Sequence, residues 1–411
     1  MNAGSRRIQR TYLLLLLLHT LAASFIWGIN TLFLLDAGLS NAQAFSANAF
    51  FTAGLVLFEI PTGVIADTRG RRLSYLLGTI TLTLSTLLYL LMWKVTAPFW
   101  AWALTSAFLG LGFTFFSGAV QAWLVDALAA SGFDGKLDSV FARGEIVEGI
   151  AMLGGSVAGG VIAQATNLGV PYILRAIVLA ITLVAAFFLM RDIGFAPTRS
   201  KRLTTEVKKV LRGSIKHGLG NPSVRWLMLA APFIDGVSIY AFYAMQPYLL
   251  ELYGSTEAYG IAGLTAAIVA GAQIVGGLLV PHVGRVFHRR TSVLLLAASV
   301  GAAALLLAGT IRNFWVVIVL LVLWGLVFAV VMPVRQAYLN GLISSEHRAT
   351  VLSFDSLLGS GGGVVVQPVL GKAADVWSYP ISYIAGSAIQ ALAIPFIWLA
   401  HREHASSDAI Q

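Results

Sequence analysis

Ionisable side chains inside long apolar runs are the residues of this sequence most capable of chemistry. Four of them stand out: Asp235, Glu59, Glu148 and His19. A charge in an apolar environment is costly, so residues of this kind are retained mainly where they act. A carboxyl or imidazole group at such a place can take up and release a proton or contact a cation. The alternative for each is a side chain held permanently by a neighbouring hydrogen-bond donor.

Asp235 is the most central of the four. At a rise of 1.5 Å per residue it lies about 18 Å from the start of its apolar run, near the middle of a bilayer core. Ser238, Phe242 and Gln246 follow it at spacings that place them on the same helix face. We expect Asp235 to carry a proton or to contact a cation.

Aromatic and amide side chains in the apolar runs are candidates for the wall of a binding cavity. They are Trp27, Asn30, Gln121, Tyr240, Tyr243, Gln246, Gln273 and Trp324. An aromatic cavity with isolated acids suits an amphipathic, often cationic ligand. The alternative is that these aromatic rings face lipid or the packed core.

The short stretch "GVIADTRGRR" (63–72) crowds charges between two apolar runs. Its notable residues are Gly63, Asp67, Arg69, Gly70, Arg71 and Arg72. The glycines permit close packing and a tight turn. Asp67 is placed to meet a helix N-terminus, which favours a carboxylate. We interpret the stretch as a latch between helices, and a simple basic loop that sets topology is the alternative.

Composition defines the elements that position these residues. The chain has 411 residues, of which 58% are hydrophobic and 11% charged, whereas soluble domains carry about 25% charged residues. The apolar runs are too long for the strands of a membrane barrel, so we predict an all-α integral membrane protein. Cys is absent, which excludes disulfides and Cys-based metal sites. The sequence indicates no catalytic residue, metal site or cofactor.

Twelve apolar runs are long enough to span a bilayer. The first follows Arg6, Arg7 and Arg10 and is too long for a cleaved signal segment. The predicted spans are approximately 11–36, 43–66, 73–93, 98–126, 141–165, 170–190, 224–250, 257–281, 291–311, 313–340, 348–372 and 379–400.

One long basic link divides these spans into two halves. We predict a first half at 1–190, a linker at 191–223, a second half at 224–400 and a tail at 401–411. Most of the 27 Lys and Arg residues fall on the side that holds both termini and this linker. The positive-inside rule makes that side cytoplasmic, in a cell membrane. The net charge of +9 thus reflects topology and contact with membrane lipid, not nucleic acid.

The two halves repeat each other. When Gly63 is aligned with Gly277, Gly70 falls on Gly284 and Arg71 on Arg285. At nearly the same offset, "QAWLVDAL" (121–128) matches "QAYLNGLI" (336–343). Two matches at one offset indicate two six-helix halves in the same orientation, an architecture of transporters.

The stretch 63–72 resembles the signature of the major facilitator superfamily, G-x-x-x-D-R-x-G-R-R, with Thr68 in place of the first Arg. The resemblance extends to the twelve spans, the two halves and the basic central loop. It implies that Asp67 meets the start of the eleventh span, near 348–352, and that Arg71 pairs with Asp126. It also implies alternating access, in which this latch on the cytoplasmic side breaks and re-forms.

Further charges lie near the cytoplasmic ends of the spans, at Arg143, Glu145, Arg335 and Asp355. Pairs such as Arg335 with Asp355, or Arg143 with Glu148, would serve as salt bridges of a cytoplasmic gate. Alternatively, one of these acids binds the proton or the substrate. We favour the gate for Asp355 and Glu145, and leave both roles open for Glu59 and Glu148.

The fifth span resembles the G-P-x-x-G-G motif of drug–proton antiporters of the same superfamily. Gly155, Ser156, Gly159 and Gly160 fit it, with Ser in place of Pro. Close helix packing is the alternative reason for small residues there. In addition, Ser106 stands where those antiporters carry an Arg linked to proton coupling.

These features favour a secondary transporter that exports hydrophobic or amphipathic, often cationic, small molecules in exchange for protons or another coupling ion. The alternative is a carrier for another substrate class, such as a metabolite, a sugar or a lysolipid. We expect a monomer. An enzyme is disfavoured because no H-E-x-x-H motif or Cys nucleophile is present, and the sequence has no phosphate-binding Gly-Lys-Ser loop for an ATPase.

Overall fold

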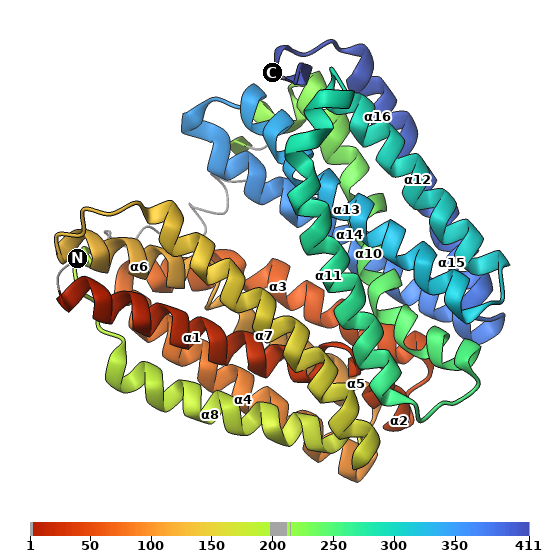
Figure 1. The fold of residues 1–411 in the computed structure, drawn as a ribbon, viewed down its shortest axis with the longest axis horizontal. Coiled ribbons are helices and arrows are strands. Elements are labelled where there is room, and N and C mark those ends of the chain that lie inside the picture. Colours follow the sequence, from red (N-terminus) through yellow and green to blue (C-terminus); the bar gives the residue numbers. More distant parts are fainter. Residues whose placement is uncertain (1–2, 198–211, 214, 411) are drawn as a thin grey trace. The chain divides into compact units, whose positions relative to one another are not determined.

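The computed structural model describes residues 3–197, 212–213 and 215–410, and helices dominate them (Figure 1). Among these residues, 11 helical segments are long and apolar enough to cross a membrane. The helix α14 (Ser345–Val376) covers the remaining predicted span. The prediction of an all-α, multi-pass membrane protein is therefore confirmed. Residues 198–211 and 214 of the predicted linker lie outside the described residues.

The helices of the first part of the chain are α1 (Ala3–Trp27), α2 (Asn30–Asp36), α3 (Asn41–Arg69), α4 (Arg71–Val95), α5 (Phe99–Thr114), α6 (Ala119–Ala130), α7 (Leu137–Ala165) and α8 (Gly169–Leu189). The second part contains η1 (Ile215–Leu219), α10 (Pro222–Tyr253), α11 (Tyr259–Val286), α12 (Arg290–Thr310), α13 (Phe314–Leu342), α14, α15 (Tyr379–Ala391), α16 (Ala393–Arg402) and η2 (Ser406–Asp408).

Three spans that the sequence predicts as single helices are each divided in two. They correspond to α1 with α2, α5 with α6, and α15 with α16. Between α5 and α6, Gly118 has a φ of 65°, a left-handed conformation that an α-helix cannot continue through. Gly28, between α1 and α2, lies so close to α11 that an added Cβ would be 3.0 Å from the Cα of Gly263. Apolar composition alone does not reveal such breaks.

Polar side chains fix several helix starts. The side chain of Asn221 accepts a hydrogen bond from the backbone N–H of Ser223 at the start of α10. Asn313 and Ser378 cap α13 and α15 in the same way. Such caps satisfy backbone donors that have no partner inside the helix.

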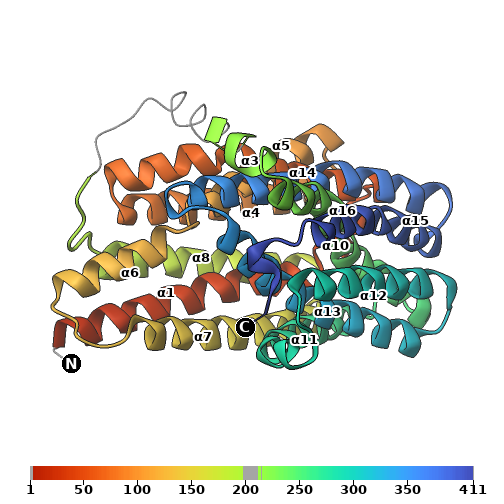
Figure 2. The same cartoon turned by 90° about the horizontal axis from the view of Figure 1, so that it is seen from above.

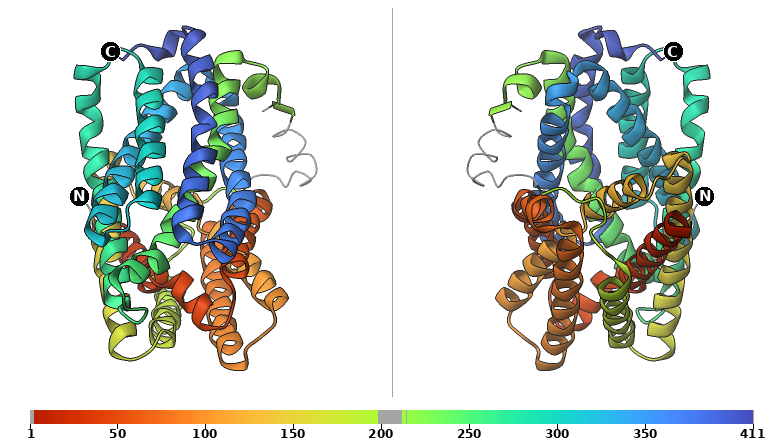
Figure 3. Two further views of the ribbon diagram at one scale, coloured as in Figure 1. Left: turned by 90° about the vertical axis from the view of Figure 1, so that its right-hand side faces the viewer. Right: turned by 90° about the vertical axis from the view of Figure 1, so that its left-hand side faces the viewer.

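The helices form two compact units. Among the described residues, unit 1 contains 3–38, 50–197 and 259–267, and unit 2 contains 39–49, 212–213, 215–258 and 268–410. In unit 1, α1 packs against α7 and α8, and α4 against α5 and α8 (Figure 1). In unit 2, α12 packs against α13 and α15 (Figure 2), and α10 against α14 and α16 (Figure 3).

In each unit an aspartate caps a long helix. In unit 1, Asp192 follows α8, and its Oδ1 accepts a hydrogen bond of 2.9 Å from the backbone N–H of Arg72 in the first turn of α4. In unit 2, Asp408 follows α16, and its Oδ1 accepts one of 2.8 Å from the backbone N–H of Thr291 in the first turn of α12. The sequence repeat thus extends to a repeated tertiary contact.

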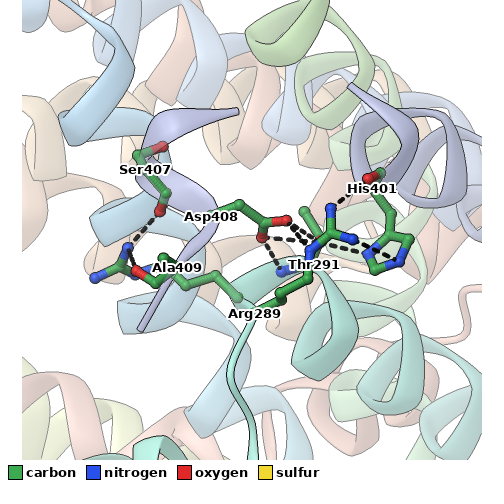
Figure 4. A network of polar contacts seen from close by, with 7 residues as sticks. Arg289, Thr291, His401, Ser407, Asp408 and Ala409 are labelled. Atoms are coloured by element: carbon green, nitrogen blue, oxygen red, sulfur yellow. Dashed lines mark hydrogen bonds and ion pairs between the residues drawn. The ribbon is translucent and has the colours of Figure 1, made fainter. Parts of the chain in front are cut away.

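The cap in unit 2 belongs to a larger network that anchors the C-terminal segment (Figure 4). Asp408 also accepts hydrogen bonds from Arg289 Nε, at 2.7 Å, and from the Thr291 hydroxyl, at 2.8 Å. The guanidinium of Arg290 donates to the carbonyl oxygens of Ser407 and Ala409. Because Asp408 is only 2% exposed, the end of the chain forms part of the packed structure of unit 2.

Candidate functional site

Unit 1 contains an open cavity of about 320 Å³ that brings together three of the predicted site residues. His19 comes from α1, Gln121 from α6 and Glu148 from α7. Tyr75 and Phe116 add aromatic wall, and the remaining lining residues are Leu15, Leu16, Ser117, Gly118 and Val120. The cavity therefore combines an aromatic and aliphatic wall with a few polar groups, as small-molecule sites do.

His19 packs among aromatic rings. Its ring centroid lies 4.2 Å from that of Phe116 and 5.9 Å from that of Phe113. Its Nδ1 is buried and has no hydrogen-bond partner among the described residues. A buried nitrogen without a partner is uncommon, which makes His19 a notable member of the cavity lining.

Glu59 of α3 joins the cavity through a hydrogen bond. Its Oε1 accepts from the hydroxyl of Ser117 at 2.5 Å, and Ser117 itself lines the cavity. Ser117 precedes Gly118, where the chain breaks between α5 and α6. The helix break thus positions the hydroxyl that connects Glu59 to the cavity.

Arg175 of α8 is a candidate that the sequence analysis did not single out. It is 2% exposed, its Nε donates to the hydroxyl of Thr86 at 3.1 Å, and its guanidinium lies 5.9 Å from the ring centroid of Phe113. Phe113 in turn contacts His19. An Arg inside an apolar span, in the second turn of α8, was the available indication.

Unit 2 contains a buried ion pair close to Asp235. The guanidinium of Arg335 on α13 donates two hydrogen bonds to the carboxylate of Asp355 on α14, at 2.5 and 2.7 Å. The predicted pairing of Arg335 with Asp355 is confirmed. Both residues are charged neighbours of Asp235, whose carboxylate lies against Gly359 of α14. The acid predicted to carry a proton therefore belongs to a charged cluster built from α10, α13 and α14.

The other predicted wall residues lie in different surroundings. Tyr240 is 1% exposed and donates to the hydroxyl of Ser382 at 2.6 Å, so it packs in the core of unit 2. Asn30 accepts a hydrogen bond from the Tyr172 hydroxyl and is also buried. Cross-helix hydrogen bonds hold both side chains in the packed core, and not on the wall of a described cavity as expected.

The five remaining wall candidates vary in burial. Gln246 is fully buried, whereas Trp27, Tyr243 and Gln273 are half-buried. Trp324 is 3% exposed and borders a small cavity of about 20 Å³ in unit 2, next to Ser238, Arg335 and Gln390.

The predicted latch at 63–72 has local partners. Gly70 adopts a φ of 110° and separates α3, which ends at Arg69, from α4. Arg71 pairs with Asp67, which lies four residues earlier on the other side of the break at Gly70, instead of with Asp126 as expected. The guanidinium of Arg72 donates to the carbonyl oxygen of Phe187 at 2.6 Å. The break at Gly70 brings the end of α3 next to the start of α4, so Arg71 finds an acid within reach there, which explains the difference.

The second predicted gate pair does not form. Arg143 and Glu145 are exposed, Glu148 is half-buried, and no ion pair joins Arg143 to Glu148 in the part of the chain that the structure describes. Glu148 faces the cavity of unit 1 instead.

The antiporter-like motif of α7 packs closely against two helices of unit 1. A Cβ on Gly155 would lie 2.6 Å from Ser24 of α1, and one on Gly159 would overlap the carbonyl oxygen of Phe25. A Cβ on Gly160 would lie 2.5 Å from the carbonyl oxygen of Tyr259 at the start of α11. Ser156 is 1% exposed within the same contact. Close helix packing, which the sequence left open as the alternative reason for small residues here, is observed.

This fold, with cavities and buried charges inside bundles of long apolar helices, defines a multi-pass membrane protein. The sequence matches the Major Facilitator Superfamily over residues 12–366, so the chain belongs to that family. No curated protein sequence matches it. The family indicates a transporter and not an enzyme.

Solved structures with the same fold transport different molecules. The nucleoside transporter NupG is 12% identical, covering 97% of this chain and 99% of its own, with a TM-score of 0.78. A bacterial homologue of the human lysosomal transporter Spinster is 17% identical, covering 100% and 99%, with a TM-score of 0.70. A D-xylose–proton symporter is 15% identical, covering 96% and 98%, with a TM-score of 0.68. These similarities show the fold, and the substrate of this chain has to be inferred from its own site.

Proposed function

We propose that this transporter exports amphipathic, preferably cationic, small molecules in exchange for protons by alternating access. We place it in the cell membrane with both termini in the cytoplasm, because basic residues are concentrated in the links on that side. The observation that carries the proposal is the cavity in unit 1 with Glu148 among its lining residues and Glu59 linked through Ser117.

The chemistry of this cavity suits a cation with an apolar body. Two carboxylates provide negative charge, and Tyr75 and Phe116 provide aromatic faces that attract a cation. The volume of about 320 Å³ lies in the range of small-molecule pockets. Gln121 would orient the molecule by hydrogen bonds.

The charged cluster of unit 2 would supply the coupling. Asp355 accepts two hydrogen bonds from Arg335. Asp235 is therefore the acid of this cluster that lies outside the ion pair. A carboxyl group in this position can bind a proton from one side of the membrane and release it to the other. Energy then comes from the proton gradient.

The experiment uses proteoliposomes that contain a pH-sensitive dye. Lipophilic cations are added to the wild type, Asp235→Asn and Glu148→Gln, with Asp138→Asn as the control, because Asp138 is an exposed acid of the same helix outside the lining of the cavity. We expect cations to evoke proton flux in the wild type and the control. Asp235→Asn should lose the flux, and Glu148→Gln should weaken cation binding.

Neutral drugs, sugars and lysolipids form the comparison panel. Flux evoked by sugars or lysolipids and not by cations would overturn the proposed substrate class. Transport of cations without proton movement would overturn the coupling.

A further inference from the structure

A second hollow in unit 1, separate from the cavity above, lies at the start of α1. It has a volume of about 390 Å³ and is lined by Arg6, Arg7, Arg10, Thr11, Leu14 and Leu189. All three guanidinium groups belong to exposed residues. No ion pair or hydrogen bond occupies them among the residues that the structure describes.

The arginines are held by a helix whose other face is packed. Ser5, Ile8 and Gln9 are 1%, 6% and 5% exposed, and the Ser5 hydroxyl is hydrogen-bonded to that of Ser131 at 2.9 Å. Tyr12, one turn later, is 3% exposed. The three guanidinium groups therefore extend from a fixed helix and not from a loose terminal segment.

The hollow changes from basic to apolar along α1. Leu14 is 38% exposed on the apolar side, and Leu189 borders the same hollow from the end of α8, next to Phe188, which is 66% exposed. The apolar run of α1 begins just after Arg10. The arginines thus lie where the polar headgroups of a bilayer meet its hydrocarbon core.

We propose that this hollow binds an anionic phospholipid. Guanidinium groups stay charged at all relevant pH values and pair with phosphate oxygens through two parallel N–H donors. The lipid phosphate would pair with Arg6, Arg7 and Arg10, and an acyl chain would lie over Leu14 and Leu189. If this basic segment only set the membrane topology, it would need neither a hollow nor an adjoining apolar surface. The proposal is independent of the proposed transport substrate.

The test measures lipid retention by native mass spectrometry of the full chain, purified in detergent and mixed with phosphatidylglycerol or phosphatidylcholine. The variant is Arg6→Gln/Arg7→Gln/Arg10→Gln. Its matched control, Lys136→Gln/Arg212→Gln/Lys216→Gln, removes the same charge from exposed residues outside the hollow. We expect wild type and control to retain phosphatidylglycerol over phosphatidylcholine, and the variant to lose at least about tenfold in affinity.

Two outcomes would overturn the proposal. Equal losses in the variant and the control would show only general attraction by net charge. Displacement of phosphatidylglycerol by glycerol 3-phosphate at comparable concentration would show a site for soluble phosphates. If the threefold variant does not fold, Arg10→Gln alone is compared with Lys136→Gln, and unchanged retention in Arg10→Gln would count against the site.

Discussion

At the scale of single residues, burial distinguishes two ion pairs of similar composition. The side chains of Arg335 and Asp355 are 11% and 6% exposed, whereas those of Arg71 and Asp67 are 18% and 51% exposed. Removing one partner of a buried pair leaves an uncompensated charge away from water. An exposed acid keeps its solvation and loses little.

We therefore expect Asp355→Asn to lower the free energy of unfolding by about 3–5 kcal/mol. The same change in the exposed pair, Asp67→Asn, should cost less than about 1 kcal/mol. Thermal unfolding of both purified variants in the same detergent measures the difference. Similar shifts in Tm for the two variants would contradict the assignment of Arg335 and Asp355 as a buried structural pair.

At the scale of elements, the packing of α7 depends on where its small residues point. Gly159 faces the backbone of α1, whereas a Cβ on Gly154 of the same helix would meet nothing within 4 Å. Two glycines of one motif region thus have opposite tolerance for a methyl group.

Gly159→Ala should destabilise the protein by about 1–3 kcal/mol because the added methyl group must separate α1 from α7. Gly154→Ala is the matched control and should be neutral or slightly stabilising, since Ala favours a helix over Gly. The yield of folded protein and the Tm of each variant test this. An undisturbed Tm in Gly159→Ala would mean that α1 and α7 pack less closely than described.

The anchored C-terminal segment gives a second prediction for an element. Asp408→Asn removes the negative charge that accepts hydrogen bonds from Arg289 and from the first turn of α12. It should lower the free energy of unfolding by about 1–3 kcal/mol. Limited proteolysis should then cleave the chain after α16 faster than in the wild type. Asp192→Asn, the equivalent cap in unit 1, should leave that cleavage rate unchanged. Equal cleavage in wild type and Asp408→Asn would show that the network does not hold the tail.

At the scale of the whole molecule, the proposed alternating access would separate the binding of substrate from the rate of turnover. Residues 63–72 lie outside the lining of the cavity in unit 1, so the proposed latch should act on conformational exchange. Arg71→Ala should slow transport by about tenfold while substrate affinity changes by less than about twofold. Initial transport rates in proteoliposomes and equilibrium binding in detergent provide the two quantities.

Arg69→Ala serves as the control, since Arg69 is an exposed basic residue of the same link without a described ion pair. Equal slowing in both variants would point to loss of basic charge as the cause. Unchanged transport in Arg71→Ala would contradict the latch hypothesis.

The sequence by itself determined the class of protein, because a bilayer imposes the length and apolar composition of each span on the local sequence. Two motif matches at one offset also predicted two repeated halves. The sequence also predicted the pair of Arg335 and Asp355, whose charges lie at similar depth. For Gly155, Gly159 and Gly160 it offered close packing as the alternative to an antiporter motif, because small side chains leave room for a neighbouring helix.

Only the tertiary structure decided which of these residues meet. It brought His19, Gln121 and Glu148 to one cavity, connected Glu59 to it through Ser117, and gave Arg71 a partner other than the expected one. It also showed that three predicted spans are each divided in two and that Asp408 caps the first turn of α12. These outcomes depend on helix rotation, local breaks and contacts between residues far apart in the chain. Hydrophobic patterning records that a residue lies in a span, but not which neighbouring helix it will face.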